Sequence, residues 1–245
     1  MRSGEEASIP KVALVGHPNV GKTTLFNALT GERRKVGNYP GITVEKVSAT
    51  IYTPHGNQIE LVDLPGAYSL TPDSPDEAVT RDVLLGDLDG EGQPDLVICV
   101  LDAASLERHL YLAMQVMDLG LPVLLALNQV DRAEESGLRI NPQVLSDEFD
   151  VPVVACEATG GRGIVQLKQA LRFPLPPPAA RKWKTNSTVE HALSDLSRKL
   201  EDLGVDRPEA HALQLLSETN YRVEPQAHLR REAQLAAREA AAGLI

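Results

Sequence analysis

One eight-residue stretch constrains the fold of this chain more than any other feature. Gly16-His17-Pro18-Asn19-Val20-Gly21-Lys22-Thr23 matches the pattern G-x-x-x-x-G-K-[ST], and it joins an apolar run at 11–15 to a helical segment at 22–29. Such a turn gathers backbone N–H groups and a helix N-terminus around bound phosphate. We expect Lys22 to reach the β- and γ-phosphates of a nucleotide and the Thr23 hydroxyl to bind Mg²⁺.

Strand and helix signals alternate through the first 170 residues. Apolar, β-branched runs lie at 47–52, 58–62, 96–101, 123–127 and 151–155. The turn cluster at 54–57 predicts a hairpin, and Ser74, Pro75 and Glu77 form the start signal of a helix. The alternation predicts an α/β fold with a doubly wound, mostly parallel sheet, in which ligands bind beyond the C-terminal strand ends.

A second motif, Asp63-Leu64-Pro65-Gly66, follows the run at 58–62. A carboxylate at this strand end can hold a magnesium-bound water, and the Gly66 N–H can reach a γ-phosphate. A third motif, Asn128-Gln129-Val130-Asp131, follows the run at 123–127. There Asp131 can accept two hydrogen bonds from the N1 and N2 groups of guanine, a pattern that adenine does not offer, so it favours GTP over ATP. Gln129 replaces the usual lysine, which predicts a somewhat lower affinity.

Two weaker segments complete the predicted site. Glu157, Ala158 and Thr159 occupy the position of the last base-contacting loop, where backbone N–H groups make the contact. Thr43, between the first helix and the hairpin, is placed to bind Mg²⁺ only when a γ-phosphate is present, which would make its segment a switch. The residues predicted to contact the nucleotide are Gly16, His17, Pro18, Asn19, Val20, Gly21, Lys22, Thr23, Thr24, Gly41, Ile42, Thr43, Asp63, Leu64, Pro65, Gly66, Asn128, Gln129, Asp131, Glu157, Ala158 and Thr159.

The position that often orients the attacking water is not a glutamine here. Ala67 follows Gly66, and its methyl group cannot hold a water. Hydrolysis must then depend on backbone positioning and on another charge, and the predicted catalytic groups are Lys22, Thr43, Gly66 and Asn19. Asn19 is a candidate ligand for a monovalent cation, so we expect stimulation by K⁺.

The composition is that of a soluble globular protein, with a net charge of −10 and 42% apolar residues. The acidic balance argues against nucleic acid as a partner. Cys99 and Cys156, the only two cysteines, lie in apolar runs without metal-ligand spacing, which predicts buried, reduced thiols and a cytosolic location. The apolar runs are too short for a membrane span, and the N-terminus has no secretory signal.

The pattern changes near residue 172. A proline-rich segment, Phe173-Pro174-Leu175-Pro176-Pro177-Pro178, predicts a stiff linker, and only helical signals follow it. Ser187 and Glu190 fit a capping box, and an apolar stripe comprises Val189, Leu193, Leu196, Leu200 and Leu203. Further helices are predicted from about residue 208 and from 225 to 242. We therefore expect a P-loop G domain at 1–172, a linker at 173–186 and a small all-α domain at 187–245.

The segments between the motifs resemble one family, FeoB, the bacterial ferrous-iron transport protein B. The resemblance rests on residues 16–27, on Val36-Gly37-Asn38-Tyr39-Pro40-Gly41-Ile42-Thr43-Val44-Glu45, and on Asp63-Leu64-Pro65-Gly66-Ala67-Tyr68-Ser69-Leu70. It also includes Ser74-Pro75-Asp76-Glu77 and Arg81-Asp82. The helical tail fits the family only by its size and helicity.

The resemblance implies a P-loop GTPase domain, followed by a helical domain similar to a nucleotide-dissociation inhibitor. In FeoB these lead into a polytopic membrane region that carries Fe²⁺, and GTP binding with slow hydrolysis regulates or drives uptake. The chain is then expected to lie at the cytoplasmic face of the bacterial inner membrane, as part of a longer protein whose membrane region is absent here. The family's K⁺ site would comprise Asn19 with backbone carbonyls near Gly37 and Tyr39.

Two other functions stay open at this stage. An RNA- or ribosome-associated GTPase would require a basic tail, whereas this tail is acidic. A nucleotide-gated binding switch with incidental hydrolysis is favoured by Ala67. Whether the chain forms a homo-oligomer is also open.

Overall fold

The computed structural model describes residues 9–217 except 32, 173, 174, 176, 182, 185 and 206. The chain divides into two compact units. The first, here called the G unit, comprises Met1–Val116 and Leu121–Ala179, and the second, the helical unit, comprises Met117–Gly120 and Ala180–Ile245. The predicted domain boundaries, 1–172 and 187–245 with a linker at 173–186, stay a prediction, and the helix predicted at 225–242 lies outside the described residues.

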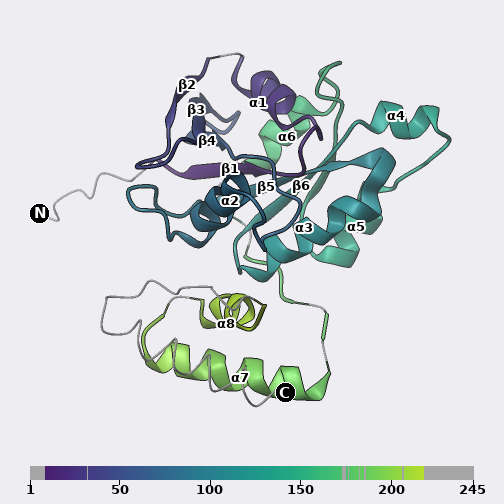
Figure 1. Cartoon of the computed structure of the whole chain (residues 1–245). Coiled ribbons are helices and arrows are strands. Elements are labelled where there is room, and N and C mark those ends of the chain that lie inside the picture. The colour runs from purple at the N-terminus through teal and green to yellow at the C-terminus, as the bar shows by residue number, and fades with distance from the viewer. Residues whose placement is uncertain are drawn as a thin grey trace, which may run out of the picture. The chain divides into compact units, whose positions relative to one another are not determined.

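A seven-stranded sheet forms the centre of the G unit (Figure 1). Its strands are β1 (Lys11–Val15), β2 (Lys35–Asn38), β3 (Glu45–Tyr52), β4 (Gln58–Asp63), β5 (Leu96–Asp102), β6 (Val123–Asn128) and β7 (Val153–Ala155), in the spatial order β2-β3-β4-β1-β5-β6-β7. Five neighbouring strands of the sheet are parallel, in the order β4-β1-β5-β6-β7. The predicted doubly wound, mostly parallel sheet is therefore confirmed.

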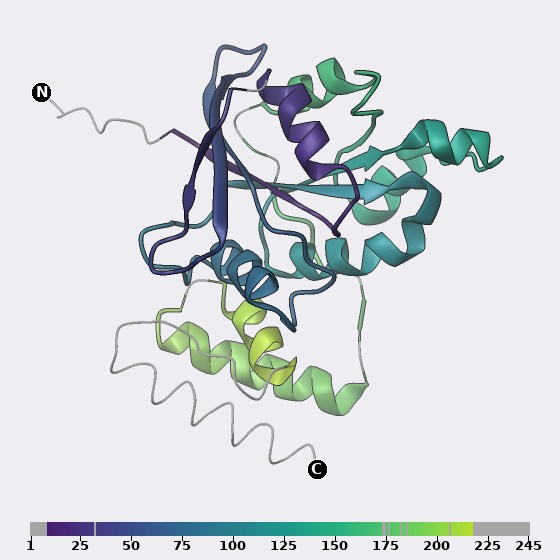
Figure 2. The same cartoon turned by 45° about the horizontal axis from the view of Figure 1, so that its top comes forward.

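The predicted hairpin is also confirmed, and it is longer than expected. β3 and β4 pair antiparallel from Val47 opposite Asp63 to Tyr52 opposite Gln58. Figure 2 shows this hairpin as a long ribbon beside α1 (Lys22–Thr30). β2 was not expected from the sequence, and it extends the hairpin by pairing antiparallel with β3. The antiparallel edge therefore begins within the predicted switch segment.

Helices cover both faces of the sheet. The remaining helices of the G unit are α2 (Pro75–Leu85), α3 (Leu106–Asp118, whose last two residues belong to the helical unit), α4 (Val130–Glu135), α5 (Pro142–Phe149) and α6 (Ile164–Ala170). Figure 1 shows α1 and α6 on one face and α2, α3 and α5 on the other. α2 begins as predicted, because the Ser74 side chain accepts a hydrogen bond from the Glu77 N–H and Pro75 occupies the first turn.

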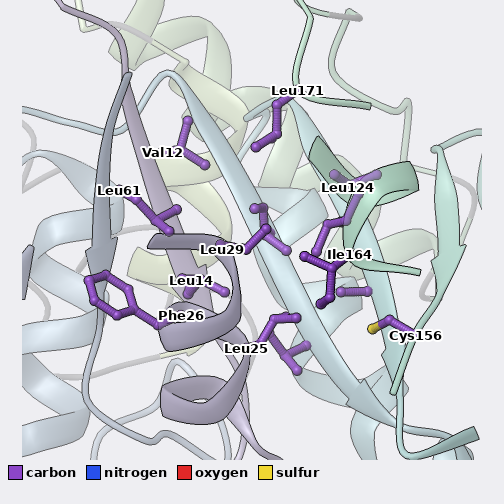
Figure 3. Close-up of a cluster of buried hydrophobic side chains, with 14 of the residues drawn as sticks. Val12, Leu14, Leu25, Phe26, Leu29, Leu61, Leu124, Cys156, Ile164 and Leu171 are labelled. Atoms are coloured by element: carbon purple, nitrogen blue, oxygen red, sulfur yellow. The ribbon is translucent and has the colours of Figure 1, made fainter. Parts of the chain in front are cut away.

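The core under α1 fixes the position of the first motif. Leu25, Phe26 and Leu29 project from α1 onto the strands and are buried with Val12 and Leu14 of β1 (Figure 3). Truncating a side chain in such a cluster costs about 3–5 kcal/mol for an aromatic residue. Cys156 belongs to the same cluster and Cys99 is buried in β5, so both thiols are buried and free, as predicted. The packing holds the helix N-terminus at the C-terminal end of β1.

The helical unit contains α7 (Ser187–Asp202) and α8 (Pro208–Ser217) among its described residues. The predicted stripe is largely confirmed, because Leu193, Leu196 and Leu200 are buried. The predicted capping box of Ser187 and Glu190 is wrong. Asn186 is the N-cap, and its Oδ1 accepts from the Val189 N–H over 3.0 Å. No described helix is long and apolar enough to cross a membrane.

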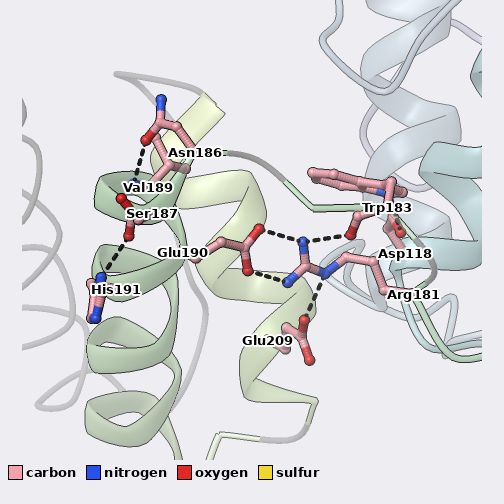
Figure 4. A network of polar contacts seen from close by, with 9 residues as sticks. All are labelled: Asp118, Arg181, Trp183, Asn186, Ser187, Val189, Glu190, His191 and Glu209. Carbon is pink, nitrogen blue, oxygen red and sulfur yellow. Dashed lines mark hydrogen bonds and ion pairs between the residues drawn. The ribbon is translucent and has the colours of Figure 1, made fainter.

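Glu190 takes part in a polar network instead of a cap (Figure 4). The Arg181 guanidinium forms two hydrogen bonds with Glu190, of 3.0 and 2.9 Å, and one of 2.9 Å with Glu209 of α8. Its centre also lies 4.7 Å from the Trp183 ring. The Trp183 indole N–H donates to the Asp118 carboxylate over 2.9 Å, while burial raises the pKa of Asp118 to about 6. These contacts join α7, α8 and residue 118 within the helical unit.

Candidate functional site

Three glycines allow the loops at the strand ends to approach one another closely. A Cβ at Gly16 would lie 2.6 Å from the Val100 carbonyl oxygen, and one at Gly66 would lie 2.9 Å from Pro18 Cγ. Gly21 has a φ of +90°, which favours glycine, and its Cβ would lie 2.5 Å from Asn128 Nδ2. The structure therefore brings the first motif, residues 16–23, against both the Asp63 motif and the Asn128 motif.

The groups predicted to bind phosphate and magnesium meet at the ends of β1 and β4. Leu14 pairs with Asp63 in the sheet register, so Asp63 lies where β1 enters the first motif. The Thr23 hydroxyl donates to Asp63 Oδ2 over 3.0 Å. Lys22 is buried at 9% exposure, and burial lowers the pKa of its ammonium, an effect that the nearby Asp63 carboxylate opposes. Burial likewise raises the pKa of Asp63, which Lys22 opposes.

This geometry fits a magnesium ion. Asp63 Oδ1 is buried and has no hydrogen-bond partner among the described residues, although a buried carboxylate oxygen normally has one. Carboxylate and hydroxyl oxygens are the ligands that Mg²⁺ prefers, and it uses few of them besides water and phosphate. Asp63 and Thr23 thus form an oxygen-rich site with an unsatisfied acceptor. Thr43, the third predicted ligand, is exposed on the loop before β3.

A cavity of about 300 Å³ opens at this site. Lys22, Thr23, Asp63 and Gly66 line it from the two motifs, and Leu64 and Pro65 contribute from the second. Three further charged residues line the cavity, namely Arg34, Glu45 and Asp76. The residues of the Asn128 motif do not line it. The cavity therefore corresponds to the phosphate and metal end of the predicted site.

Asn128 connects the predicted base end to the phosphate loop. Its side chain is 2% exposed, and its Nδ2 donates to the Val20 carbonyl over 3.0 Å. Its Oδ1 accepts from the Ala158 N–H, also over 3.0 Å. Gln129 adds a third link, because its Nε2 donates to the same Val20 carbonyl over 3.2 Å. The Asn128 amide thus joins three of the predicted nucleotide-binding loops.

Asp131 and the last loop follow the C-terminal ends of two neighbouring parallel strands, β6 and β7. Asp131 is half-buried in the first turn of α4. The loop after β7 is closed by a bridge between Glu157 and Arg162, in which the Glu157 N–H donates to the Arg162 carbonyl over 2.9 Å. The Arg162 guanidinium forms two 3.0 Å hydrogen bonds with Glu134 of α4. Thr159 is exposed at the tip of this loop.

The segment between β2 and β3, the predicted switch, forms a compact turn. The Ile42 N–H donates to the Tyr39 carbonyl and the Tyr39 N–H donates to the Val44 carbonyl, each over 3.1 Å, and Gly41 has a φ of +72°. The Tyr39 ring is 1% exposed, and burial raises the pKa of its hydroxyl. The turn leaves Thr43 exposed at its tip.

The structure does not join the three residues predicted to bind K⁺. Asn19 has a φ of +64° and an exposed side chain, which makes no hydrogen bond with the described residues. Gly37 lies within β2 opposite Lys46, and the Tyr39 carbonyl accepts the hydrogen bond from Ile42. A shared site would require the switch segment to rearrange.

Sequence reasoning missed an aromatic cluster behind the phosphate loop. The His17 ring lies 4.2 Å from that of His109 on α3 and 5.1 Å from that of Tyr68, measured between ring centres. The Arg108 guanidinium lies 5.4 Å from the Tyr68 ring. Burial, aided by the neighbouring His109, lowers the pKa of His17 to about 4, so the ring is neutral near pH 7. No spacing pattern in the sequence indicates this cluster, because its members are far apart in the chain.

The segment after Gly66 is held by hydrogen bonds from its backbone to side chains of α2 and α3. One Glu77 carboxylate oxygen accepts from the Tyr68 N–H and the other from the Asp73 N–H, each over 2.9 Å. The Leu70 N–H donates to the Gln115 side chain of α3 over 3.0 Å. The second motif is thereby followed by a loop fixed on α2 and α3.

Comparison with known proteins agrees with this geometry. The family model described as ferrous iron transport protein B matches residues 10–171. The Fe(2+) transporter FeoB of Escherichia coli (strain K12) is 43% identical over 183 residues, which are 73% of this chain and 22% of that protein. Its counterpart in Salmonella typhimurium (strain LT2) is 46% identical over 164 residues, 65% of this chain and 20% of that protein. The chain thus spans about a fifth of the length of these relatives.

Solved structures of similar chains share the fold. The cytosolic domain of L. pneumophila FeoB matches with a TM-score of 0.81 and 33% identity, covering 94% of this chain and 88% of that one. The cytosolic domain of the T. maritima FeoB iron transporter, in its GMPPNP form, matches with a TM-score of 0.77 and 33% identity, covering 96% and 97%. These matches confirm the fold of a P-loop GTPase. Since the family model spans the sheet and all the motifs around it, this chain belongs to the FeoB family, of which it contains the N-terminal G domain.

Proposed function

We propose that this chain binds GTP together with Mg²⁺ and hydrolyses it to GDP and phosphate. The observation that carries the proposal is the group formed by Lys22, Thr23 and Asp63, with the unpartnered Asp63 Oδ1 at a cavity between two glycine-rich loops. Two solved structures of similar chains support guanine nucleotides as the ligands of this site. One is the T. maritima FeoB cytosolic domain in its GMPPNP form, and the other is a GDP-bound mutant of the S. thermophilus FeoB G domain.

In this proposal the chain's own residues do most of the positioning. Lys22 and the N–H groups of the loop at 16–23, in which only Pro18 lacks one, bind the phosphates, and the Gly66 N–H faces the terminal one. Thr23, Asp63 and, once the switch segment closes, Thr43 would hold Mg²⁺, which supplies positive charge to the phosphate oxygens. Asp131 accepts from the guanine base, and Asn128 holds the loops around it.

The direct test is calorimetry on the folded chain in the presence of magnesium. We expect heat from GTP and GDP and at least 100-fold weaker binding of ATP, because the Asp131 carboxylate oxygens would be left unpaired by adenine, which is costly. Phosphate release from GTP should accompany binding of the triphosphate. An absence of heat from guanine nucleotides, or equal affinity for ATP, would contradict the proposal.

Hydrolysis is proposed to be slow and stimulated by K⁺. Ala67 cannot orient water, so an additional charge near the phosphates should accelerate the reaction. We expect single-turnover hydrolysis to be faster in KCl than in NaCl by roughly tenfold or more, since one added cation acts on the charge of the transition state. Asn19→Ala should remove the difference between the rates in the two salts. Equal rates in the two salts would favour a nucleotide-gated binding switch in which hydrolysis is incidental.

The biological role is proposed from the relatives, which are named as Fe(2+) transporters. We infer that nucleotide binding and hydrolysis here regulate or drive ferrous iron uptake by a membrane region that follows the helical unit in the whole protein. The site of action is then the cytoplasmic face of the bacterial inner membrane. The helical unit is proposed to act on nucleotide release as a dissociation-inhibitor-like domain.

A further inference from the structure

A second cation besides Lys22 lines the phosphate end of the cavity. Arg34 follows α1 by four residues and directly precedes β2, and it lines the same cavity as Lys22, Asp63 and Gly66. The sequence motifs do not include this residue. Its position on the lining places a positive charge at the end of the site where the terminal phosphate of a nucleotide is expected.

Among the described residues, the Arg34 side chain has no partner that would explain its position. It forms no hydrogen bond or ion pair with any described residue, although the carboxylates of Glu45 and Asp76 line the same cavity. It is exposed, so its five N–H donors remain available to a ligand. By contrast, Lys46 and Lys11 on the same sheet are both engaged by the buried Glu91 carboxylate, at 2.6 and 3.2 Å.

The two neighbouring cations do not share this position. Arg33 and Lys35 are also exposed, but neither lines the cavity. Lys35 begins β2 and pairs with Ser48 of β3. Of the three consecutive cations at 33–35, only Arg34 lines this cavity, which makes its neighbours matched controls.

The reaction needs such a charge. In GTP hydrolysis the water oxygen forms a bond to the γ-phosphorus, and the bond from that phosphorus to the bridging oxygen breaks. The electron pair leaves on the GDP β-phosphate, one water proton stays on the phosphate product, and the other is released to solvent. Negative charge on the phosphate oxygens is stabilised by a guanidinium, which presents two parallel N–H donors and keeps its proton at any pH of interest. Ala67 contributes nothing comparable.

We propose that Arg34 binds the γ-phosphate of GTP and stabilises the charge on it during hydrolysis, a role that rests on the GTPase function proposed above. Arg34 is then a catalytic residue supplied by the same chain from the segment before β2. Because it contacts the γ-phosphate, it also distinguishes GTP from GDP.

The test compares Arg34→Gln with Arg33→Gln, which removes the adjacent charge and keeps the net charge of the two variants equal. The affinities for GDP and for a non-hydrolysable GTP analogue are measured by calorimetry, and hydrolysis by single turnover. For Arg34→Gln we expect analogue affinity and hydrolysis rate to fall roughly tenfold or more, since a charge-assisted hydrogen bond is lost, while GDP affinity changes less than about twofold. Arg33→Gln should match the wild type in all three.

Each outcome has one interpretation. If Arg34→Gln equals Arg33→Gln while the wild type hydrolyses GTP, the role of Arg34 is wrong and the GTPase proposal stands. If the wild type itself neither binds nor hydrolyses GTP, the GTPase proposal fails and this inference fails with it. Arg34→Lys should recover part of the lost analogue affinity, because it restores the charge without the two-donor geometry. Thermal unfolding of all variants should be unchanged, as Arg34 has no partner among the described residues.

Discussion

Lys22→Ala is expected to weaken the binding of GTP and GDP by on the order of 100- to 1,000-fold, the largest effect of any single substitution in the site. The ammonium is the buried cation at the end of the first motif, and it would contact two phosphates with charge-assisted hydrogen bonds. Calorimetric titration with GDP and with a non-hydrolysable GTP analogue measures the loss.

The same substitution should leave the fold intact. Burial lowers the pKa of Lys22, which means that the folded protein holds this charge at a cost. Removing it relieves that cost, although the carboxyl of Asp63 loses the cation that opposes the rise in its own pKa. Lys199→Ala, an exposed cation on α7, serves as the control and should bind nucleotide normally. Tight GDP binding by a folded Lys22→Ala variant would contradict the assignment of the phosphate site.

Asp131→Asn is expected to change the base preference. The carboxylate is proposed to accept from guanine N1 and N2, so replacing one oxygen by an NH₂ group sets donor against donor and should weaken GTP binding roughly 100-fold or more. Xanthine carries an oxygen in place of the guanine amino group, and the Asn NH₂ can donate to it. Competition between GTP and xanthosine triphosphate for a fluorescent nucleotide measures the change.

Glu135→Gln is the matched control for this variant. Glu135 lies on the same short helix as Asp131 but is exposed, so its neutralisation should alter neither affinity. A variant that loses GTP binding without gaining xanthosine triphosphate would indicate that Asp131 supports the loop and does not read the base. Unchanged GTP affinity in Asp131→Asn would show that base recognition lies elsewhere.

Much of the G unit could be predicted from local sequence signals. β5 and β6 are buried on both faces, and such strands appear as continuous apolar runs. The start of α2 was predicted because its Ser-Pro-x-Glu pattern makes contacts within four residues. The contact between Asp63 and Thr23 could be predicted from topology. Asp63 ends β4, and Thr23 belongs to the motif that follows β1, the parallel neighbour of β4.

Other features depend on contacts that no local pattern reveals. All four residues of β2 are exposed, so no buried face marks the strand in the sequence, and it forms by pairing with β3. Ser187 and Asn186 are both good N-cap residues; the cap is Asn186, and the Glu190 that a capping box would need pairs with Arg181 instead. The neighbours of His17 and the position of Arg34 became visible only when distant segments were brought together in the fold.

The double hydrogen bonding of the Asn128 amide has a consequence for how a nucleotide would be held. Because this one side chain links the Val20 carbonyl to the Ala158 N–H, the loops at the two ends of the site are cross-linked before any ligand arrives. A molecule that spans them then binds as a chelate: once one end is anchored, the effective concentration of the other end at its own subsite is high. We therefore expect a free purine nucleoside and free inorganic triphosphate each to bind with far lower affinity than the nucleotide that contains both.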